Sequence, residues 1–313
     1  MPPASESGPY VESLMPNLLV CGLTNLEMTV RVDGFPIGYV PVRYVENGVR
    51  ATCSGVGFNV ARALHVLGNG VRFLSILGDD PAGRICREEI RAAGIDDVDI
   101  ISSDGGTAHS TILVDGVGRR QINLDLRKMQ EQTFPVDRFA AAVRDAGIAV
   151  LCNINFARPL LCEAKKLGKM IAADLHALGS LEDEYNRDWL EKADILFMSH
   201  EGLSCPPEAF APELLGRFPA RFLVIGLGSE GALLAERGRP PKRVPAVTPR
   251  PVVNTIGAGD ALFAAFLDGW LRYGDASAAL ARAVYYAGWK IGESGGAAGL
   301  MTAAELDSLY GRP

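Results

Sequence analysis

The sequence predicts an α/β fold: a doubly wound, mostly parallel sheet flanked by helices, with a small β-sheet lid. Short apolar runs alternate with segments of helical period along most of the chain, which is typical of parallel βαβ units. Two stretches, at about residues 30–53 and 107–124, interrupt this alternation with β-type residues around turn signals. The length of 313 residues suits one large domain, residues 17–313, that carries the lid strands as insertions.

The elements of the parallel sheet follow one another in order. Apolar runs predict strands at residues 18–22, 71–77, 148–152, 169–173, 195–198 and 221–226. Helices are expected at residues 81–93, 159–167, 185–191 and 276–291. The first of these helices has the clearest ends, with Asp80 as N-cap, Pro81 at its first position and Gly94 after its last turn.

The two interruptions predict antiparallel hairpins. Residues 39–53 carry an Asn-Gly pair between β-type runs, and residues 108–124 contain a turn near Asp115-Gly116. Together they predict a lid over one end of the parallel sheet. Five prolines in residues 240–251 indicate an irregular crossing segment, because the α/β pattern resumes directly after them.

Composition argues against several classes of protein. A net charge of −6 is unfavourable for an obligatory nucleic-acid partner. No apolar run has transmembrane length, and residues 1–16 form a polar, Pro-bearing tail, predicted to be disordered, without the features of a signal peptide. Six cysteines without a C-x-x-C pair and four scattered histidines predict reduced thiols and no structural zinc. We therefore expect a cytoplasmic protein without nucleic-acid or membrane partners.

The most informative stretch is Asn254-Thr-Ile-Gly-Ala-Gly-Asp260, which precedes an apolar helical segment. Gly257, Ala258 and Gly259 are expected at the N-terminus of that helix, where unpaired N–H groups and the helix dipole attract an anion. Asp260 could simply be a first-turn carboxylate that favours the dipole. A negative charge beside an anion site is useful, however, if it takes the proton from an attacking hydroxyl, and this predicts phosphoryl transfer.

A second glycine motif, Ser54-Gly-Val-Gly-Phe-Asn59, precedes a helical segment that ends at Gly68. One interpretation is structural: the glycines allow close helix–strand packing and Asn59 caps the helix. The other is functional, because an amide can bond substrate hydroxyls both as donor and as acceptor. The sequence leaves both interpretations of Asn59 open.

These two motifs, in this order and about 200 residues apart, resemble those of the ribokinase-like (PfkB) carbohydrate and nucleoside kinases. The segment GLTNLEMTVRVDGFP is similar to the first strand of that family, so the resemblance covers nearly the whole chain beyond the tail. It implies an ATP- and Mg²⁺-dependent kinase for a hydroxyl of a small sugar, ribokinase- or fructokinase-like. It also allows a homodimer through the β lid.

A nucleoside kinase, pseudouridine- or adenosine-kinase-like, is the alternative within the family. Val56 stands where many sugar kinases carry a polar residue, which leaves an apolar wall for a nucleobase, and Asn254 also occurs in pseudouridine-kinase-like relatives.

The resemblance assigns roles residue by residue. Asp260 is the implied catalytic base, with the anion hole formed by Gly257, Ala258 and Gly259. The implied substrate-binding residues are Glu27, Gly55, Gly57 and Asn59. The implied nucleotide-binding residues are Gly228, Ser229, Gly231, Thr255, Gly295 and Gly296. Glu201 is the implied magnesium ligand, acting through water.

Three positions depart from the family pattern. Asn254 replaces an aspartate that helps to bind an activating monovalent cation in related kinases, which argues against potassium activation. Ser199-His200-Glu201-Gly202 stands where the family has an asparagine-x-x-glutamate motif for magnesium and phosphate, so the asparagine is lost and the glutamate is displaced by one. Glu27 is one methylene longer than the family's sugar-binding aspartate, which indicates an altered substrate pocket.

Two more distant functions also have some support. The segment from Gly226 to Gly231 fits the dinucleotide fingerprint of an NAD-dependent oxidoreductase, but the sequence after it predicts a strand and turn instead of the required helix. The changes at Asn254 and Ser199 favour a non-catalytic sugar-binding pseudokinase. The intact Gly-Ala-Gly-Asp260 sequence favours an active enzyme.

Overall fold

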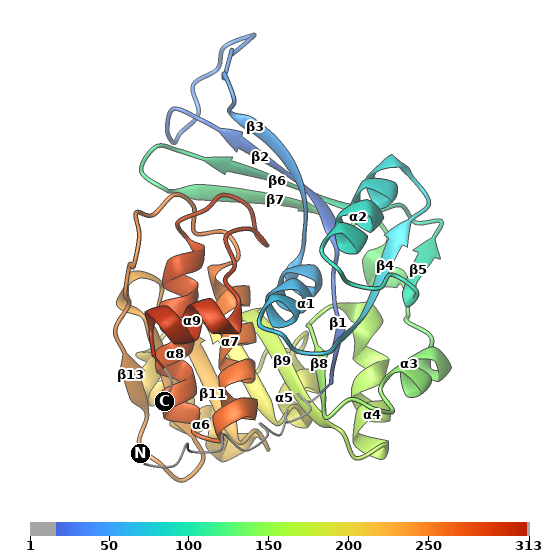
Figure 1. The fold of residues 1–313 in the computed structure, drawn as a ribbon, viewed down its shortest axis with the longest axis vertical. Coiled ribbons are helices and arrows are strands. Elements are labelled where there is room, and N and C mark those ends of the chain that lie inside the picture. The colour runs from blue at the N-terminus through green and yellow to red at the C-terminus, as the bar shows by residue number, and fades with distance from the viewer. Residues whose placement is uncertain (1–16, 312–313) are drawn as a thin grey trace, which may run out of the picture.

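The computed structural model describes residues 17–311; the disordered tail predicted for residues 1–16 lies outside this range. A large sheet contains β1 (Leu18–Cys21), β4 (Val71–Gly78), β5 (Ile100–Ser103), β8 (Ile148–Leu151), β9 (Met170–Ala177), β10 (Ile195–Ser199), β11 (Phe222–Gly226), β12 (Ala232–Glu236) and β13 (Lys242–Val244). A small sheet contains β2 (Asn25–Arg31), β3 (Val49–Ser54), β6 (Ala108–Val114) and β7 (Arg120–Asp125). Figure 1 shows the small sheet lying across one end of the large one.

The helices are α1 (Val56–Val66), α2 (Pro81–Ala92), α3 (Val136–Ala142), α4 (Arg158–Lys166), α5 (Arg187–Lys192), α6 (Pro207–Arg217), α7 (Ala258–Tyr273), α8 (Ala276–Lys290) and α9 (Ala303–Leu309). Short 3₁₀ turns form η1 (Met129–Glu131), η2 (Asn155–Ala157) and η3 (Gly228–Glu230). The predicted strands and helices of the large sheet are confirmed, with ends displaced by a few residues. Asp80 caps α2 as predicted, because its Oδ1 accepts a hydrogen bond of 2.7 Å from the Gly83 N–H. None of the helices within residues 17–311 has the length and apolar character that a membrane crossing requires.

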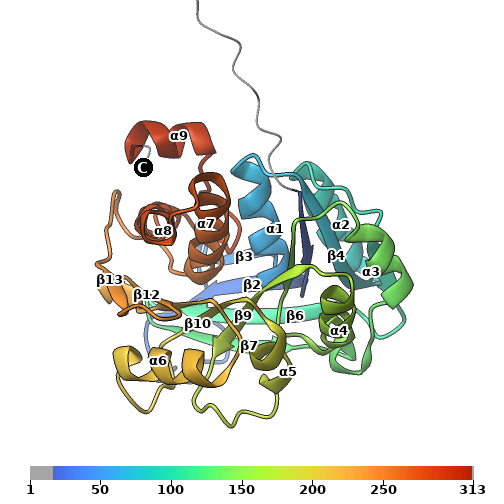
Figure 2. The same ribbon diagram turned by 90° about the horizontal axis from the view of Figure 1, so that it is seen from below.

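The large sheet separates two hydrophobic cores. Its order is β13-β12-β11-β10-β9-β8-β1-β4-β5, parallel except for the antiparallel edge strands β12 and β13. Side chains alternate along each buried strand, so Leu18 and Val20 pack with α1, α7 and α8, whereas Leu19 and Cys21 pack with α3 to α6. Figure 2 shows these two helical layers on opposite faces. The doubly wound α/β prediction is therefore confirmed.

The lid sheet has the order β3-β2-β6-β7. The predicted hairpin of residues 108–124 is confirmed, since β6 pairs with β7 in antiparallel register and Ile112 lies opposite Ile122. The prediction of a hairpin within residues 39–53 is wrong in its first half. Asn47 does form a turn, with φ of +51°, but β3 pairs with β2 instead of with residues 39–45.

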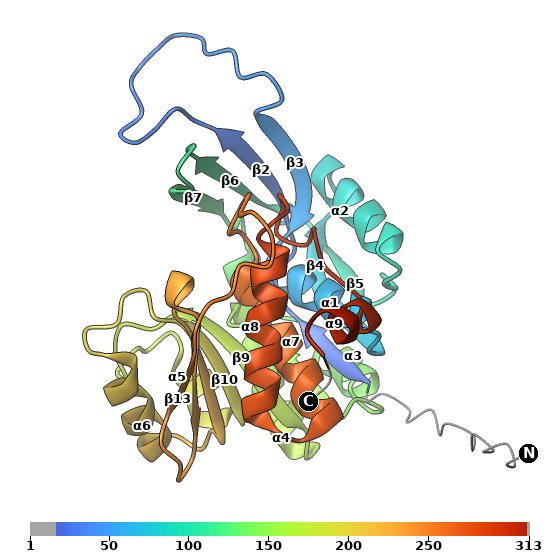
Figure 3. The ribbon, with the colours of Figure 1, turned by 60° about the vertical axis from the view of Figure 1, so that its left-hand side comes forward.

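Tertiary pairing explains this error. The chain leaves β1 and enters β2 almost at once, and β2 then pairs with both β3 and β6. The β-type run at 39–45 is left without a neighbouring strand, and Tyr39 and Tyr44 are 92% and 93% exposed. Figure 3 shows the connection between β2 and β3 as a long loop that extends beyond the lid. β propensity reflects how well a side chain fits a packed, paired surface, and residues 39–45 have no such surface to pack on.

The region after β11 contradicts the dinucleotide-binding alternative. The glycines from Gly226 to Gly231 lead through η3 into β12, which pairs antiparallel with β11. A dinucleotide fingerprint requires a helix at this place, whose N-terminus faces the pyrophosphate. The predicted strand and turn are confirmed, and the proline-rich crossing segment contains only the short strand β13.

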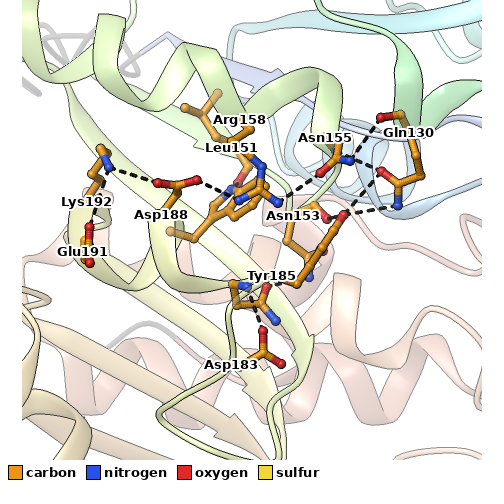
Figure 4. Close-up of polar contacts among 12 residues, drawn as sticks. Gln130, Leu151, Asn153, Asn155, Arg158, Asp183, Tyr185, Asp188, Glu191 and Lys192 are labelled. Carbon is orange, nitrogen blue, oxygen red and sulfur yellow. Dashed lines mark hydrogen bonds and ion pairs between the residues drawn. The ribbon is translucent and has the colours of Figure 1, made fainter.

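A network of polar contacts lies beyond the carboxyl end of β8 and joins the neighbouring helices (Figure 4). The guanidinium group of Arg158 lies 4.4 Å from the centre of the Trp189 ring and 5.0 Å from that of Tyr185. Its Nη1 donates to Asp188 Oδ2 at 2.7 Å, and Trp189 Nε1 donates to the Leu151 carbonyl at 3.1 Å. Arg158 thereby joins α4 to α5.

We expect Arg158→Met to lower the free energy of unfolding by about 1–2 kcal/mol, because it removes an ion pair and the cation–π contacts with two rings. Urea denaturation of the variant and the wild type measures this change. Lys166→Met on the same helix is the control, since its exposed ion pair with Glu163 should contribute no more than about 0.5 kcal/mol. Equal stability of the two variants would contradict a structural role for Arg158.

Candidate active site

The anion loop, residues 254–259, enters α7 beneath the lid. Gly257 is the N-cap of α7 and has a left-handed backbone, with φ of +75°. A Cβ at this position would lie 2.1 Å from the Gly296 carbonyl oxygen, so both the backbone angle and the space require glycine. The N–H groups of the first turn have no partner within the helix, and small residues surround them. These features suit an anion, and the predicted anion hole at Gly257, Ala258 and Gly259 stays a prediction.

Asp260 lies in the first turn of α7 and meets Asn59 from the other motif. The Asn59 Nδ2 donates to Asp260 Oδ2 at 2.7 Å, across 201 positions of sequence. The interpretation of Asn59 as a helix cap is wrong, because α1 has Gly55 as its N-cap and Asn59 lies inside the first turn. Its buried amide instead fixes the orientation of the carboxylate.

The surroundings of Asp260 raise its pKa to about 6. Burial is the largest cause, and the neighbouring carboxylate of Asp174 adds to it. The hydrogen bond from Asn59 and the charges of His176 and Lys290 act in the opposite direction. A carboxylate with this pKa is ionised at neutral pH and is a stronger base than an ordinary aspartate, which suits it to accept a hydroxyl proton.

Asp174 is a member of the site that the sequence interpretation missed. It lies buried in β9, where burial raises its pKa, and its Oδ1 accepts a hydrogen bond from the His176 N–H at 2.8 Å. His176 has a φ of +58°, and the pairing with β10 shifts register there. One signal was available in the sequence: Asp174 is the one acidic residue in the mostly apolar strand MIAADLHA.

The two glycines of the first motif hold α1 against β1. Gly55 has a φ of +104°, and a Cβ there would lie 2.5 Å from the Leu23 carbonyl oxygen. A Cβ at Gly57 would lie 2.4 Å from the Gly22 carbonyl carbon. The helix–strand packing interpretation is therefore correct for both glycines. Their predicted contact with the substrate stays a prediction.

A buried polar row leads from the lid to Asp260. Glu27 of β2 is 3% exposed, and its Oε1 accepts a hydrogen bond of 3.3 Å from the Thr29 hydroxyl. Burial raises the Glu27 pKa, while hydrogen bonds from Ser54 and Thr29 and the charge of Lys290 lower it. Ser54 Oγ in turn accepts a bond of 3.4 Å from Asn59 Nδ2. Glu27, Ser54, Asn59 and Asp260 thus form one continuous set of donors and acceptors.

Two cations that were not predicted from sequence contact the anion loop. Lys290, the last residue of α8, is fully buried and donates to the Ile256 carbonyl. Burial lowers its pKa to about 8, although Asp260 and Glu27 favour its charged form. Arg120 of β7 donates to the Thr255 hydroxyl, so the lid touches the loop directly.

The residues with implied nucleotide contacts fall into two groups. Gly228, Ser229 and Gly231 belong to the turn around η3, where Ser229 is exposed. Phe197 lies between the end of β11, which precedes this turn, and the anion loop, because its ring would be 3.8 Å from a Cβ at Gly226 and 3.7 Å from one at Gly259.

Gly295 and Gly296 form the second group, and Gly296 lies beside Asn59. A Cβ at Gly296 would be 2.7 Å from Asn59 Nδ2, and Gly295 has a φ of +108°. Gly296 therefore packs on the motif that holds Asp260. The nucleotide contacts of these glycines and of Thr255 stay predictions.

Asn254 and Glu201 mark the departures from the family pattern. The Asn254 Oδ1 accepts a bond of 2.8 Å from the Ile256 N–H, so a neutral amide shapes the loop. Glu201 is exposed after β10, and its N–H donates to Ser199 Oγ at 3.2 Å. Within residues 17–311 no three His, Cys, Asp or Glu side chains gather as metal ligands. Mg²⁺ in proteins is commonly held by one or two carboxylates together with substrate phosphates, and the role of Glu201 at this metal stays a prediction.

Comparison with known proteins identifies the family. The sequence model described as pfkB family carbohydrate kinase matches residues 15–303. The chain belongs to this family. The acarbose 7(IV)-phosphotransferase of Actinoplanes sp. is 28% identical to this pfkB-family kinase over 258 residues, which cover 82% of this chain and 85% of that protein. The ATP-dependent ribose-1-phosphate kinase of Halopiger xanaduensis is 29% identical, covering 85% and 88% of the two chains.

Solved structures of kinases with similar folds agree with this family assignment. A microbiome-derived acarbose kinase superimposes with a TM-score of 0.87 at 28% identity, covering 95% of this chain and all of that one. The ribokinase of Arabidopsis thaliana, solved with ribose and ATP, has a TM-score of 0.77 at 21% identity over 94% and 98% of the chains, and it supports the fold. This pfkB-family kinase is therefore a phosphotransferase that acts on a hydroxyl of a sugar or nucleoside, and kinases of this family use ATP.

We expect kcat/KM to fall as the pH drops below about 6, because protonated Asp260 cannot take the hydroxyl proton. Asp174→Asn should move this acid limb to lower pH, since it removes the like charge that raises the Asp260 pKa. The other groups that act on Asp260, namely Asn59, His176 and Lys290, remain unchanged in this variant. A pH–rate profile of both proteins tests this, and a level profile from pH 7 to 5 would contradict it.

We expect Gly57→Ala to lower the free energy of unfolding by about 1–3 kcal/mol, because its methyl group would overlap the Gly22 backbone. Gly216→Ala in α6 is the matched control, since no atom lies within 4 Å of its Cβ position. Replacing a helical glycine there should be stabilising by up to about 1 kcal/mol. Urea denaturation of both variants gives the comparison, and unchanged stability of Gly57→Ala would show that α1 does not depend on this contact.

Proposed function

We propose that this kinase transfers the γ-phosphoryl group of ATP to a hydroxyl of a small sugar, with Asp260 as the base. The hydrogen bond between Asn59 and Asp260 carries the proposal. It joins the polar row that reaches Glu27 in the lid to a carboxylate at the N-terminus of α7. One end of this arrangement suits hydroxyl groups and the other suits an anion.

The chemistry is an in-line displacement. The sugar hydroxyl oxygen attacks the γ-phosphorus, its proton passes to an Asp260 carboxylate oxygen, and the bond from the γ-phosphorus to the bridging oxygen breaks to release ADP. The first-turn N–H groups at Gly257 to Gly259 stabilise charge on the transferred group. When bound, Mg²⁺ supplies further positive charge at the phosphates. The lid, which contacts the loop through Arg120, excludes water.

The chemistry of the substrate side favours a sugar over a nucleoside. Asn25, Glu27, Ser54 and Asn59 are all buried where the lid joins α1, and they provide donors and acceptors suited to hydroxyl groups. Val56, the apolar wall expected for a nucleobase, is partly buried and packs against the hydrophobic core. Acarbose kinases are among the relatives with 28% identity, which supports a carbohydrate. A nucleoside kinase of Methanothermobacter thermautotrophicus is 26% identical, so nucleosides are the second candidate class of substrate.

The experiment is a measurement of ADP formation by purified protein with Mg²⁺ and ATP. The panel contains pentoses, hexoses, acarbose, ribose 1-phosphate and nucleosides. We expect one carbohydrate to turn over, and Asp260→Asn to lower kcat by roughly 10²–10⁴-fold with the fold intact. Asp137→Asn is the matched control, because Asp137 is also a first-turn carboxylate, on the exposed start of α3.

Near-normal turnover by Asp260→Asn would remove this residue from the role of base. Preferred turnover of a nucleoside would replace the proposed substrate class while keeping the chemistry. Binding of ATP without turnover of any carbohydrate or nucleoside would favour the pseudokinase alternative.

A further inference from the structure

Lys290 is a buried cation directly beneath the anion loop. It is the last residue of α8, it has no exposed surface, and its ammonium group donates to the Ile256 carbonyl. Burying an ammonium group is costly unless it is paired. Burial lowers its pKa to about 8, and the carboxylates of Asp260 and Glu27 limit this decrease. Because burying this charge lowers stability, packing alone does not explain why a lysine stands at this position.

The anchoring of the loop does not by itself require a lysine. The N–H groups of Val253 and Asn254 both donate to the Ile291 carbonyl, at 2.8 and 3.0 Å. The side chain of Asn254 adds a bond to the Ile256 N–H. These neutral hydrogen bonds already join the loop to the end of α8. What Lys290 adds is a positive charge at the carbonyl that immediately precedes Gly257.

The charges around the site show why that position matters. The carboxylates of Asp260 and Glu27 both act on the charge of Lys290, and the carboxylate of Asp174 adds negative charge beside Asp260. The positive charges of Arg120 and Arg250 contribute to the lowered pKa of Lys290. Arg120 is exposed in the lid, and Arg250 donates to the Trp289 and Gly299 carbonyls, so neither replaces Lys290 at the Ile256 carbonyl. Backbone carbonyl oxygens can bind a monovalent cation, and neighbouring carboxylates favour a positive charge there. Here the ammonium group occupies such a position.

We propose that Lys290 is a built-in monovalent cation of the phosphoryl-transfer site, which positions the anion loop through the Ile256 carbonyl and makes added potassium unnecessary. The inference rests on the proposed kinase function. Lys290 acts as a positioning residue, because it touches the loop and not the reacting atoms. The neutral side chain of Asn254, in the place of the family's cation-binding aspartate, is consistent with this, since a covalently attached cation does not need that carboxylate as a ligand.

The first test compares cations. Wild-type turnover, and its affinity for a non-hydrolysable ATP analogue measured by calorimetry, should be the same in potassium, sodium and choline chloride. Lys290→Ala should lower kcat by roughly 10²-fold, as the loss of one preorganised donor does, and weaken analogue binding about tenfold. Ammonium or potassium ions should then restore a large part of both losses in a saturable manner. Lys169→Ala is the matched control, because Lys169 also donates to loop carbonyls, those of Arg144 and Ala146.

The second test uses the pH profile. Lys290→Met keeps an apolar stem of similar length but loses the charge that lowers the Asp260 pKa. The acid limb of kcat/KM should therefore move to higher pH, which a purely structural role would not cause. Thermal unfolding of each variant shows whether it folds; if Lys290→Ala does not, Lys290→Gln takes its place in the cation comparison.

The outcomes separate the two proposals. Activation of the wild type by potassium, or losses in the folded variants that no cation restores, would overturn the role of Lys290. Absence of turnover with every compound in the panel would count against the proposed kinase function. The binding measurements still decide the inference in that case, because cation-dependent analogue binding by Lys290→Ala and cation-independent binding by the wild type need no turnover.

Discussion

The hydrogen bond from Asn59 to Asp260 determines the geometry of the site, because it holds the carboxylate between the N-termini of α1 and α7. Two close backbone contacts make it possible. Gly57 packs on Gly22, and Gly257 packs on Gly296, each at a distance that a Cβ would prevent. The glycines of both motifs therefore serve the placement of Asp260, the proposed base, in addition to their predicted contacts with ligands. Their structural and functional interpretations do not exclude each other.

Burial then sets the chemistry of the groups that this geometry brings together. It raises the Asp260 pKa to about 6 and lowers the Lys290 pKa to about 8, so each change favours the neutral form. Between these values the carboxylate is nevertheless ionised and the ammonium group is charged. The site therefore holds a proton acceptor and a cation together at neutral pH. Either group would be less useful in water, where the base would be weaker and the cation screened.

The sequence predicted what depends on local pattern and failed where distant segments meet. Apolar runs located the strands, Asp80 and Pro81 marked the start of α2, and the two motifs placed Asn59 and Asp260. Lys290 had an ordinary local explanation as a cation in a final helical turn. Its contact with Ile256, like that of Arg120 with Thr255, joins elements whose proximity only the folded sheet creates. The turn at Asn47 was predicted at the right position, but the strand that pairs with β3 was not, because that pairing depends on the assembly of the whole lid sheet.

The lid connects these features into one unit. β2 carries Glu27, and its neighbour β3 leads through Gly55 directly into the helix that carries Asn59. β7, in the same sheet, carries Arg120 and reaches the anion loop. A displacement of the lid would thus move two groups relative to Asp260 at the same time. These are the buried carboxylate of Glu27 and the guanidinium group of Arg120. Under the proposed function, a substrate whose hydroxyls bond Glu27 would favour the same lid position in which Arg120 meets the loop, and this position would exclude water from the site.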